Sequence, residues 1–124
     1  MDKYKKLYDM AVEASLKSYS PYSNFSVGSA ILTSDGEIFT GANIENMSFS
    51  LTVCAERTTI FKAVSEGKKD FEAIAIYGKE NPCIPCGACL QVMSEFCDDD
   101  FKIILSDGMH TLKELFPNAF KYNA

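Results

Sequence analysis

The spacing of hydrophobic positions changes several times along this chain, and each change indicates a different element. Near the beginning, apolar residues recur about every 3.6 positions, which is typical of an amphipathic helix. The same period returns later, and between the helical segments lie short apolar and β-branched runs that favour strands. We expect helices over residues 3–18, 54–66, 87–97 and 111–116, and strands over residues 26–33, 37–42, 71–77 and 101–105. In the second helix, the residues expected to be buried are Ile60, Phe61, Ala63 and Val64.

Residues that favour turns separate these elements. Asp35-Gly36 lies between two β-prone runs, which is a strong hairpin signal, and Pro82 and Pro85 force a loop before the third helix. A fifth strand around residues 109–111 has the weakest pattern. A hairpin followed by alternating helices and strands predicts an α/β fold, in which helices pack on a mixed sheet.

Length and composition restrict the class of protein. The 124 residues suffice for one domain, residues 1–124, and 47% hydrophobic with 23% charged residues is typical of a globular chain. The net charge of −5 argues against a nucleic-acid partner, because proteins that follow phosphates usually present a basic surface. Charges interrupt residues 1–19, and no apolar run approaches the ~20 residues of a membrane span, so we expect a cytoplasmic protein with no membrane partner.

Candidate chemistry is concentrated in the cysteines. There are five, and an odd number with a cluster from Cys83 to Cys89 does not suggest a disulfide framework. Cys54 opens one expected helix, and Cys86 and Cys89 flank the start of another, where the partial positive charge of a helix N-terminus stabilises thiolates. Three protein ligands leave the fourth position of a tetrahedral Zn²⁺ open, as in catalytic sites. We expect one such zinc ion.

Two charged residues follow Cys54 on the same expected helix. Glu56 is placed to transfer protons to and from a water molecule bound at the metal. The alternative is an ordinary acidic residue that the helix dipole stabilises at the helix N-terminus. Cys-x-Glu followed by Pro-Cys-x-x-Cys is the signature of zinc-dependent nucleobase deaminases, in which the glutamate does not ligate the metal. Three thiolates and Zn²⁺ sum to one negative charge, which Arg57 could offset by donating hydrogen bonds to the sulfurs. Otherwise Arg57 is a surface residue paired with Glu56 or Glu66.

Cys83 supports a competing interpretation. It also forms a Cys-x-x-Cys pair with Cys86, so a closed four-cysteine site would be structural and the chain a zinc-stabilised interaction module. A thioredoxin-like redox pair is less well supported, because the expected β-α context does not precede Cys86.

Several motifs together resemble the small homotetrameric cytidine deaminases, and they do so in the same order across nearly the whole chain. The motifs are Ser20-Pro21-Tyr22-Ser23-Asn24-Phe25, Asn43-Ile44-Glu45-Asn46, Cys54-Ala55-Glu56-Arg57-Thr58, Pro85-Cys86-Gly87-Ala88-Cys89-Leu90-Gln91 and Leu115-Phe116-Pro117-Asn118-Ala119-Phe120. The resemblance implies a three-layer α/β/α sandwich around a mixed five-stranded sheet, with one Zn²⁺ per chain on Cys54, Cys86 and Cys89. It also implies contact of Arg57 with these sulfurs.

The resemblance also implies substrate-binding residues. Asn43 and Glu45, which point the same way in an extended segment, would bind the sugar 3′-hydroxyl; otherwise they are polar loop residues. Phe25 would form an aromatic wall for the pyrimidine, or else belong to the core. The Ala55 N–H would reach the pyrimidine carbonyl. Phe120 would enter the site of a neighbouring subunit, which makes the sites of the homotetramer shared, or else pack on its own core.

Two positions depart from the family pattern. Phe49 stands where tyrosine is frequent, and Leu90 stands where arginine is frequent. The resemblance implies that the first change removes a hydroxyl near the sugar-binding loop or a subunit contact, and that the second alters a subunit contact.

The function implied by the resemblance is that of a hydrolase of pyrimidine salvage. It would deaminate cytidine and deoxycytidine to uridine and deoxyuridine, with release of ammonia. A related aminated nucleoside such as blasticidin S is the alternative substrate. A polynucleotide is a weaker one, because the chain is short and acidic.

Overall fold

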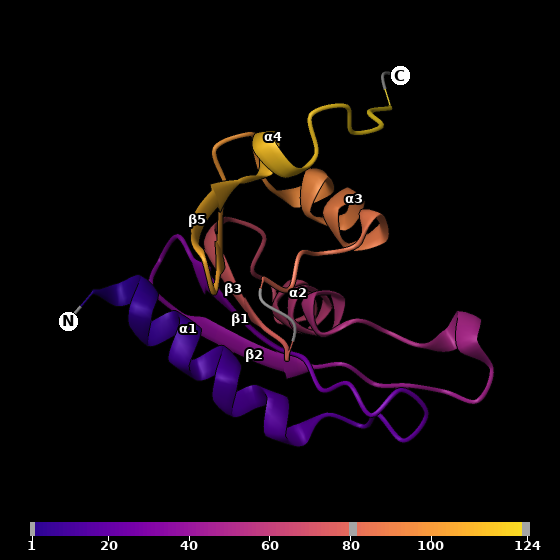
Figure 1. The fold of residues 1–124 in the computed structure, drawn as a ribbon. Helices are drawn as coiled ribbons and strands as arrows, with labels where there is room; N and C mark the ends of the chain where they lie inside the picture. Colours follow the sequence, from indigo (N-terminus) through magenta and orange to yellow (C-terminus); the bar gives the residue numbers. More distant parts are fainter. Residues whose placement is uncertain (1, 80–81, 123–124) are drawn as a thin grey trace.

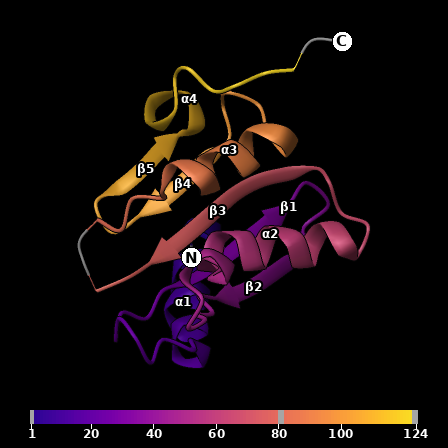
Figure 2. The ribbon, with the colours of Figure 1, turned by 90° about the vertical axis from the view of Figure 1, so that its right-hand side faces the viewer.

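The structure is a computed structural model that describes residues 2–79 and 82–122. Its strands are β1 (Gly28–Thr33), β2 (Ile38–Ala42), β3 (Phe71–Tyr77), β4 (Lys102–Leu105) and β5 (Gly108–Thr111). They form a five-stranded sheet in the order β2-β1-β3-β4-β5 (Figures 1 and 2). Neighbouring strands are antiparallel, except that β3 and β4 are parallel. The expected mixed sheet is therefore confirmed, and the weakly patterned fifth strand is present.

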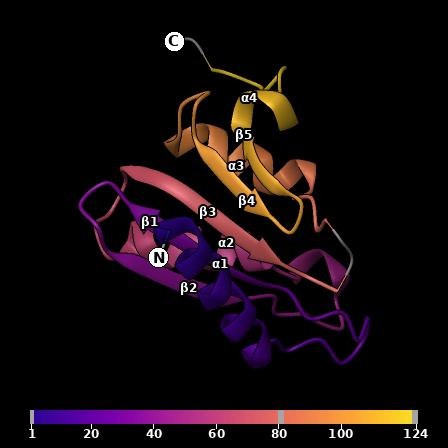
Figure 3. The same cartoon turned by 60° about the vertical axis from the view of Figure 1, so that its left-hand side comes forward.

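Helices cover both faces of this sheet. They are α1 (Lys3–Ala14), α2 (Ala55–Ser65), α3 (Gly87–Phe96) and α4 (Leu112–Leu115), with short 3₁₀ segments at Ser15–Lys17 and Phe49–Leu51. Helix α1 lies across one face, and α2 and α3 lie on the other (Figures 2 and 3). This is the expected three-layer α/β/α sandwich.

Alternation along the central strands divides the core into two layers. In β1, Ile31 packs toward α2 and α3, whereas Ala30 and Leu32 pack toward α1. In β3, the corresponding sets are Ile74 and Ile76, and Ala73 and Ala75. A strand buried on both faces needs apolar residues at nearly every position, which explains the continuous apolar runs in the sequence.

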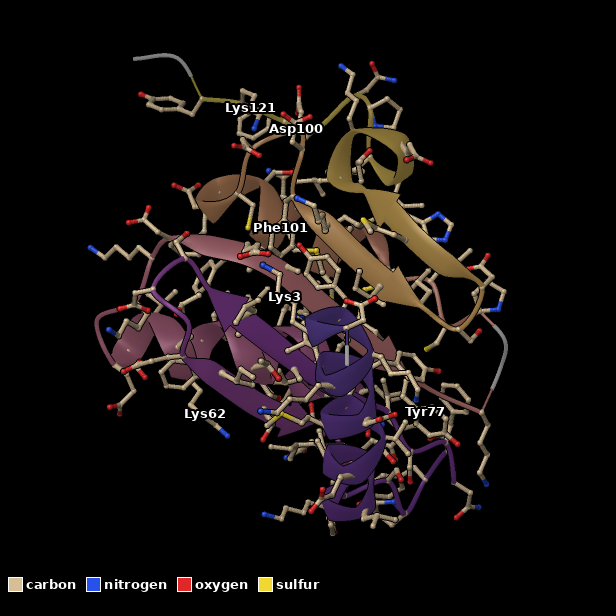
Figure 4. All side chains as sticks on the ribbon, turned by 90° about the vertical axis from the view of Figure 1, so that its left-hand side faces the viewer. Lys3, Lys62, Tyr77, Asp100, Phe101 and Lys121 are labelled. Carbon is tan, nitrogen blue, oxygen red and sulfur yellow. The ribbon has the colours of Figure 1, made fainter. Side chains whose placement is uncertain are left out.

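The first turn of α1 is fixed to the start of β3. Asp2 caps the helix by accepting a hydrogen bond from the Tyr4 N–H at 2.9 Å. Glu72 in β3 accepts a hydrogen bond from the Tyr4 hydroxyl at 2.5 Å and pairs with Lys3 at 2.6 Å; Figure 4 labels Lys3. These contacts keep α1 in register over the sheet.

Gly28 allows α1 to approach β1 closely. A Cβ atom at Gly28 would lie 2.1 Å from the Ala11 carbonyl oxygen and 2.4 Å from the Ser15 nitrogen. Both of these atoms belong to the backbone, so neither can rotate out of the way as a side chain would. The position therefore requires glycine if the helix is to keep its place.

We expect the substitution Gly28→Ala to lower the free energy of unfolding by about 3 kcal/mol, because it overpacks a site with no room to relax. Urea denaturation followed by circular dichroism measures this change. Gly87→Ala is the matched control, since a Cβ there meets no atom within 4 Å. A Gly28→Ala protein as stable as this control would contradict the close approach.

The elements lie near their expected positions, with small differences at the ends. The first helix ends as α-helix at Ala14 and continues as a 3₁₀ segment to Lys17, and β1 begins at Gly28 instead of residue 26. One expected core residue is wrong: Phe61 is 47% exposed, while Ile60 and Ala63 are buried. Each residue turns an α-helix by about 100°, so Phe61 is carried away from the sheet when Ile60 faces it.

Between β2 and α2 the chain leaves the sheet and forms a projecting loop (Figure 1). Large apolar side chains of this loop are exposed, namely Met47, Phe49 and Leu51. Exposed apolar groups gathered on one segment are typical of an interaction surface. None of the helices in the described part of the chain combines the length and apolar character needed to cross a membrane.

Candidate metal centre

Two helix N-termini bring three cysteine thiols together on one side of the sheet. Cys54 is the N-cap residue of α2, Cys86 is the N-cap residue of α3, and Cys89 lies in the first turn of α3. The Cys86 sulfur lies 3.9 Å from that of Cys54 and 3.6 Å from that of Cys89. All three sulfurs lie within 4.8 Å of one another. The structure thus brings together the three thiols expected from their spacing.

The donor set fits a zinc ion. Zn–S bonds of about 2.3 Å in tetrahedral geometry place neighbouring sulfurs about 3.8 Å apart. The separations of 3.9 Å and 3.6 Å agree with this value. Cys89 is buried, Cys54 is half-buried and Cys86 is exposed, so the group is accessible from one side. Such a site can hold a metal and still admit a small ligand.

The three thiols interact strongly with one another. The hydrogen bond with Cys89 and the guanidinium of Arg57 lower the pKa of Cys54 to about 5, against the opposing effect of burial. The pKa of Cys89 is raised, chiefly by its hydrogen bond with Cys54 and by burial. Cys54 therefore loses its proton more readily than Cys89. A bound divalent cation would favour the thiolate form of its ligands, and its binding would release the protons that they still carry.

Cys83 lies outside this group. Among the metal-ligating atoms of residues 2–79 and 82–122, the close set consists of Cys54, Cys86 and Cys89. The Cys83 sulfur instead lies over Gly78, 2.7 Å from where a Cβ would stand, next to the ring of Phe25. This placement argues against the closed four-cysteine site and for three protein ligands.

Glu56 lies in the first turn of α2, and only 5% of its surface is exposed. Burial raises the pKa of Glu56 to about 7, and the negative charge of Cys54 adds to this shift, while the backbone N–H of Glu56 itself opposes it. A carboxyl group with a pKa near 7 can both accept and donate a proton at neutral pH. Glu56 thus has the environment of a proton-transfer group beside the sulfurs.

Arg57 faces the thiol group. Its Nη2 atom donates a hydrogen bond to the Cys54 sulfur at 3.5 Å, and this contact raises the pKa of Arg57 further. The guanidinium therefore offsets negative charge at the sulfurs. This agrees with the interpretation of Arg57 as a hydrogen-bond donor to the sulfurs and not as a surface residue.

We expect the substitution Arg57→Gln to weaken zinc binding about 10- to 100-fold, because a residue that supports a ligand tunes its affinity by this amount. Competition with a chromogenic chelator measures the change. Lys62→Gln is the matched control: it removes one positive charge from the same helix, but the Lys62 ammonium donates to the Thr40 carbonyl instead of a sulfur. Equal affinities in the two variants would assign the effect to net charge alone.

Asn43 is buried and binds the chain itself. Its Oδ1 atom accepts hydrogen bonds from the Ser18 hydroxyl at 2.5 Å and the Val27 N–H at 3.0 Å, and its Nδ2 atom donates to the Phe25 carbonyl at 2.8 Å. One amide hydrogen is left over for another acceptor. Asn43 therefore also shapes the segment that carries Phe25.

Glu45 faces the same segment. One carboxylate oxygen accepts from the N–H groups of Tyr22 at 2.9 Å and Ser23 at 3.2 Å, and the Ser23 hydroxyl donates to the other oxygen. The Ser23 contact lowers the pKa of Glu45. A cavity of about 320 Å³ adjoins it, lined by Tyr22, Ser23, Glu45, Asn46, Phe49 and Thr52. Asn43 and Glu45 thus both bind the segment of residues 18–27.

Phe25 and Ala55 are both covered by the fold. Phe25 is partly buried and packs on the core cluster that lies between the sheet and helices α2 and α3, against which Cys54 also packs. Ala55, the first residue of α2, is fully buried. Its carbonyl accepts a hydrogen bond from the Ser29 hydroxyl at 2.9 Å. Sequence reasoning assigned no role to Ser29; a serine in an otherwise apolar strand was the signal available.

The C-terminal segment runs along α3 with the ring of Phe120 turned outward. The Phe120 N–H donates to Gln91 Oε1 at 3.2 Å, and Gln91 Nε2 donates to the Phe120 carbonyl at 2.9 Å. The ring is 71% exposed, so it does not pack on the core of its own chain. Gln91 was not expected to hold this segment.

The two departures from the family pattern lie in different surroundings. Phe49 is 76% exposed, and its ring meets the ring of Tyr22 edge-on at 6.3 Å between centroids. Leu90 is 5% exposed and belongs to the core beneath α3. Leu90 therefore packs within its own chain.

Comparison with known proteins identifies what this arrangement is similar to. Residues 1–105 match the family model described as the cytidine and deoxycytidylate deaminase zinc-binding region. The chain is 49% identical over 116 residues to a cytidine deaminase of Halalkalibacterium halodurans, covering 89% of this chain and 88% of that protein. It is 37% identical over 109 residues to a blasticidin-S deaminase of Bacillus cereus, covering 78% of each. The crystal structure of a cytidine deaminase from Burkholderia pseudomallei has a TM-score of 0.89 and 41% identity, covering 97% of this chain and 100% of that one.

Proposed function

The chain belongs to the cytidine and deoxycytidylate deaminase family, and we propose that it hydrolyses cytidine and deoxycytidine to uridine and deoxyuridine with release of ammonia. The observation that carries this proposal is the group of three thiols with the buried carboxyl of Glu56 beside it. Three ligands and an adjacent proton-transfer group are what hydrolytic deamination needs.

One Zn²⁺ per chain would be held by Cys54, Cys86 and Cys89, and when bound it supplies a Lewis acid that activates water. Glu56 takes a proton from the attacking water and passes it to N3 of the cytosine ring as oxygen bonds to C4. Glu56 then carries the remaining hydroxyl proton to the amino group, the C4–N bond breaks, and ammonia leaves. A pKa of about 7 suits Glu56 to both transfers.

The substrate-binding residues follow from the same site. We assign the sugar hydroxyl to Asn43 and Glu45, the face of the pyrimidine to Phe25 and the pyrimidine carbonyl to the Ala55 N–H. The place of Ala55 directly after Cys54, at the start of α2, supports the last of these roles. The cavity next to Glu45 supports a ligand at that residue.

We further propose a homotetramer with shared sites, in which Phe120 completes the site of a neighbouring subunit. The outward ring of Phe120 supports this arrangement, as do the exposed apolar residues of the loop between β2 and α2. We place this single-domain protein in the cytoplasm, in pyrimidine salvage, without nucleic-acid or membrane partners. The net charge of −5 supports the exclusion of nucleic acid.

Ammonia release from cytidine by the zinc-loaded protein tests the proposed function. We expect stoichiometric uridine, turnover of deoxycytidine as well, and much slower turnover of blasticidin S. Faster turnover of blasticidin S would move the assignment to that nucleoside, to whose deaminase the chain is 37% identical. Zinc bound at one per chain without turnover of any of the three would contradict the proposal.

A further inference from the structure

Two hydroxyl groups are sealed between the sheet and the helix that carries Glu56. Ser29 in β1 and Thr59 in α2 are both 0% exposed, and their hydroxyl oxygens lie 2.5 Å apart. The Ser29 hydroxyl also donates to the Ala55 carbonyl at 2.9 Å. Buried hydroxyls are costly unless they are bonded, and the proposed reaction and the binding of metal or substrate use neither of them directly.

The direction of these hydrogen bonds follows from the number of hydrogens. Each hydroxyl has one, and the Ala55 carbonyl has none. The Thr59 hydroxyl also lies 3.4 Å from the Ser29 carbonyl, which is a longer contact for the same hydrogen. Both short contacts are satisfied when Thr59 donates to the Ser29 hydroxyl and Ser29 donates to the Ala55 carbonyl. The result is a chain of hydrogen bonds that ends on a backbone carbonyl, and each bond in such a chain strengthens the next.

That carbonyl belongs to the peptide unit that joins Ala55 to Glu56. The nitrogen of the same unit is bonded to the Cα atom of Glu56, the second residue of α2. A rotation of this unit would therefore move the side chain of Glu56. The preceding carbonyl, that of Cys54, is held by the Thr58 N–H at 3.0 Å and the Thr58 hydroxyl at 3.2 Å. The turn between the first thiol and the carboxyl is thus fixed at two consecutive carbonyls.

Strand β2 keeps Thr59 in this position. A Cβ atom on Gly41 would lie 2.6 Å from the Thr59 hydroxyl oxygen and 3.0 Å from the Thr59 nitrogen. The backbone of β2 therefore packs directly against Thr59 and closes that side to its hydroxyl.

We infer that Ser29 and Thr59 are positioning residues for deamination: their hydrogen-bond chain fixes the Ala55–Glu56 peptide unit, and so aims the carboxyl of Glu56. This inference rests on the proposed function, in which Glu56 moves the protons. Positioning matters because a displacement of about 1 Å at a reacting group can lower a rate about 100-fold.

The test compares four variants with the wild-type protein, all loaded with zinc. Ser29→Ala removes the bond to the Ala55 carbonyl and leaves the Thr59 hydroxyl without its short partner. Thr59→Val keeps the shape of the side chain without the hydroxyl, and Thr59→Ser keeps the hydroxyl. The double variant, Ser29→Ala with Thr59→Val, leaves no hydroxyl to satisfy, and loss of both partners is close to neutral for stability.

We expect Ser29→Ala to lower kcat for cytidine about 10-fold, with KM within about 2-fold and one zinc per chain. Thr59→Ser should stay close to wild type. In the double variant the melting temperature should recover toward wild type while kcat stays as low as in Ser29→Ala. Hydrogen exchange of residues 54–60 should be faster in Ser29→Ala and remain so in the double variant.

Recovery of kcat together with the melting temperature in the double variant would overturn the inference, because the hydroxyls would then serve stability alone. A kcat unchanged in Ser29→Ala would overturn it as well. Failure of the proposed function has a different outcome: the wild-type protein itself would release no ammonia from cytidine. In that case hydrogen exchange still reports whether the two hydroxyls hold the turn.

Discussion

The substitution Glu56→Gln is expected to lower kcat for cytidine by about 10³-fold while zinc and substrate still bind. The amide has nearly the shape of the carboxyl but cannot carry a proton between water, N3 and the leaving amino group, and a positioned proton-transfer group contributes about 10² to 10⁴ in rate. Steady-state kinetics, zinc content and binding of a cytidine analogue, all on one preparation, measure the three quantities separately.

Thermal unfolding is the control for this variant. Burial raises the pKa of Glu56 from 4.5 to about 7, so folding takes up a proton between these values and stability falls as pH rises through them. Well above pH 7, Glu56 is ionised in the folded and the unfolded state, and the loss of stability caused by burying its charge is complete. The zinc-free Glu56→Gln protein should therefore melt at or above the wild-type temperature at pH 8. Near-wild-type activity in this variant would remove Glu56 from the proposed mechanism.

The second large effect is expected from Cys89→Ser, which should abolish both zinc binding at one per chain and deamination. Cys89 is the buried member of the three-thiol group, and an alcohol at that position is a far poorer zinc ligand than a thiolate. Metal analysis after gel filtration and the ammonia assay measure the two losses.

Cys83→Ser is the matched control, because it makes the same substitution in a cysteine that lies outside the group. We expect its zinc content and activity to stay near wild type. Loss of zinc from Cys83→Ser would instead indicate a site of four cysteines, and would support the interpretation of the chain as a structural-zinc module.

The order and type of most elements could be predicted from the sequence because the way each element is buried leaves a recognisable hydrophobic pattern. Strands β1 and β3 are buried on both faces, so their apolar runs are nearly continuous, and α1 has one buried stripe. The prediction that Phe61 is buried was wrong because a hydrophobic pattern alone does not show which side of a helix faces the sheet. The Phe61 side chain is as apolar as that of Ile60, and only the direction in which α2 faces the sheet decides which of the two is buried.

The group of three thiols could also be predicted from the sequence, because the Cys86–Cys89 spacing and the two helix starts limit where the sulfurs can lie. The partners of Asn43 were not, because its hydrogen bonds reach back to the segment of residues 18–27. The raised pKa of Glu56 depends on burial by several elements, which no local pattern reveals. The catalytic and substrate-binding roles of these residues stay predictions until the variants are measured.

The parallel pairing of β3 with β4 has a consequence for how the chain holds together. A parallel pair requires a crossover, and α3, which carries Cys86 and Cys89, is the helix of that crossover. Cys54 belongs to the part of the chain before it. One ion bound to all three would thus tie the hairpin half of the fold to the crossover half, closing a long loop of the unfolded chain. The metal would then have a structural role in addition to its catalytic one. We expect a chelator to loosen α3 from the sheet more readily than α1, because the contacts of α1 with β1 and β3 do not depend on the ion.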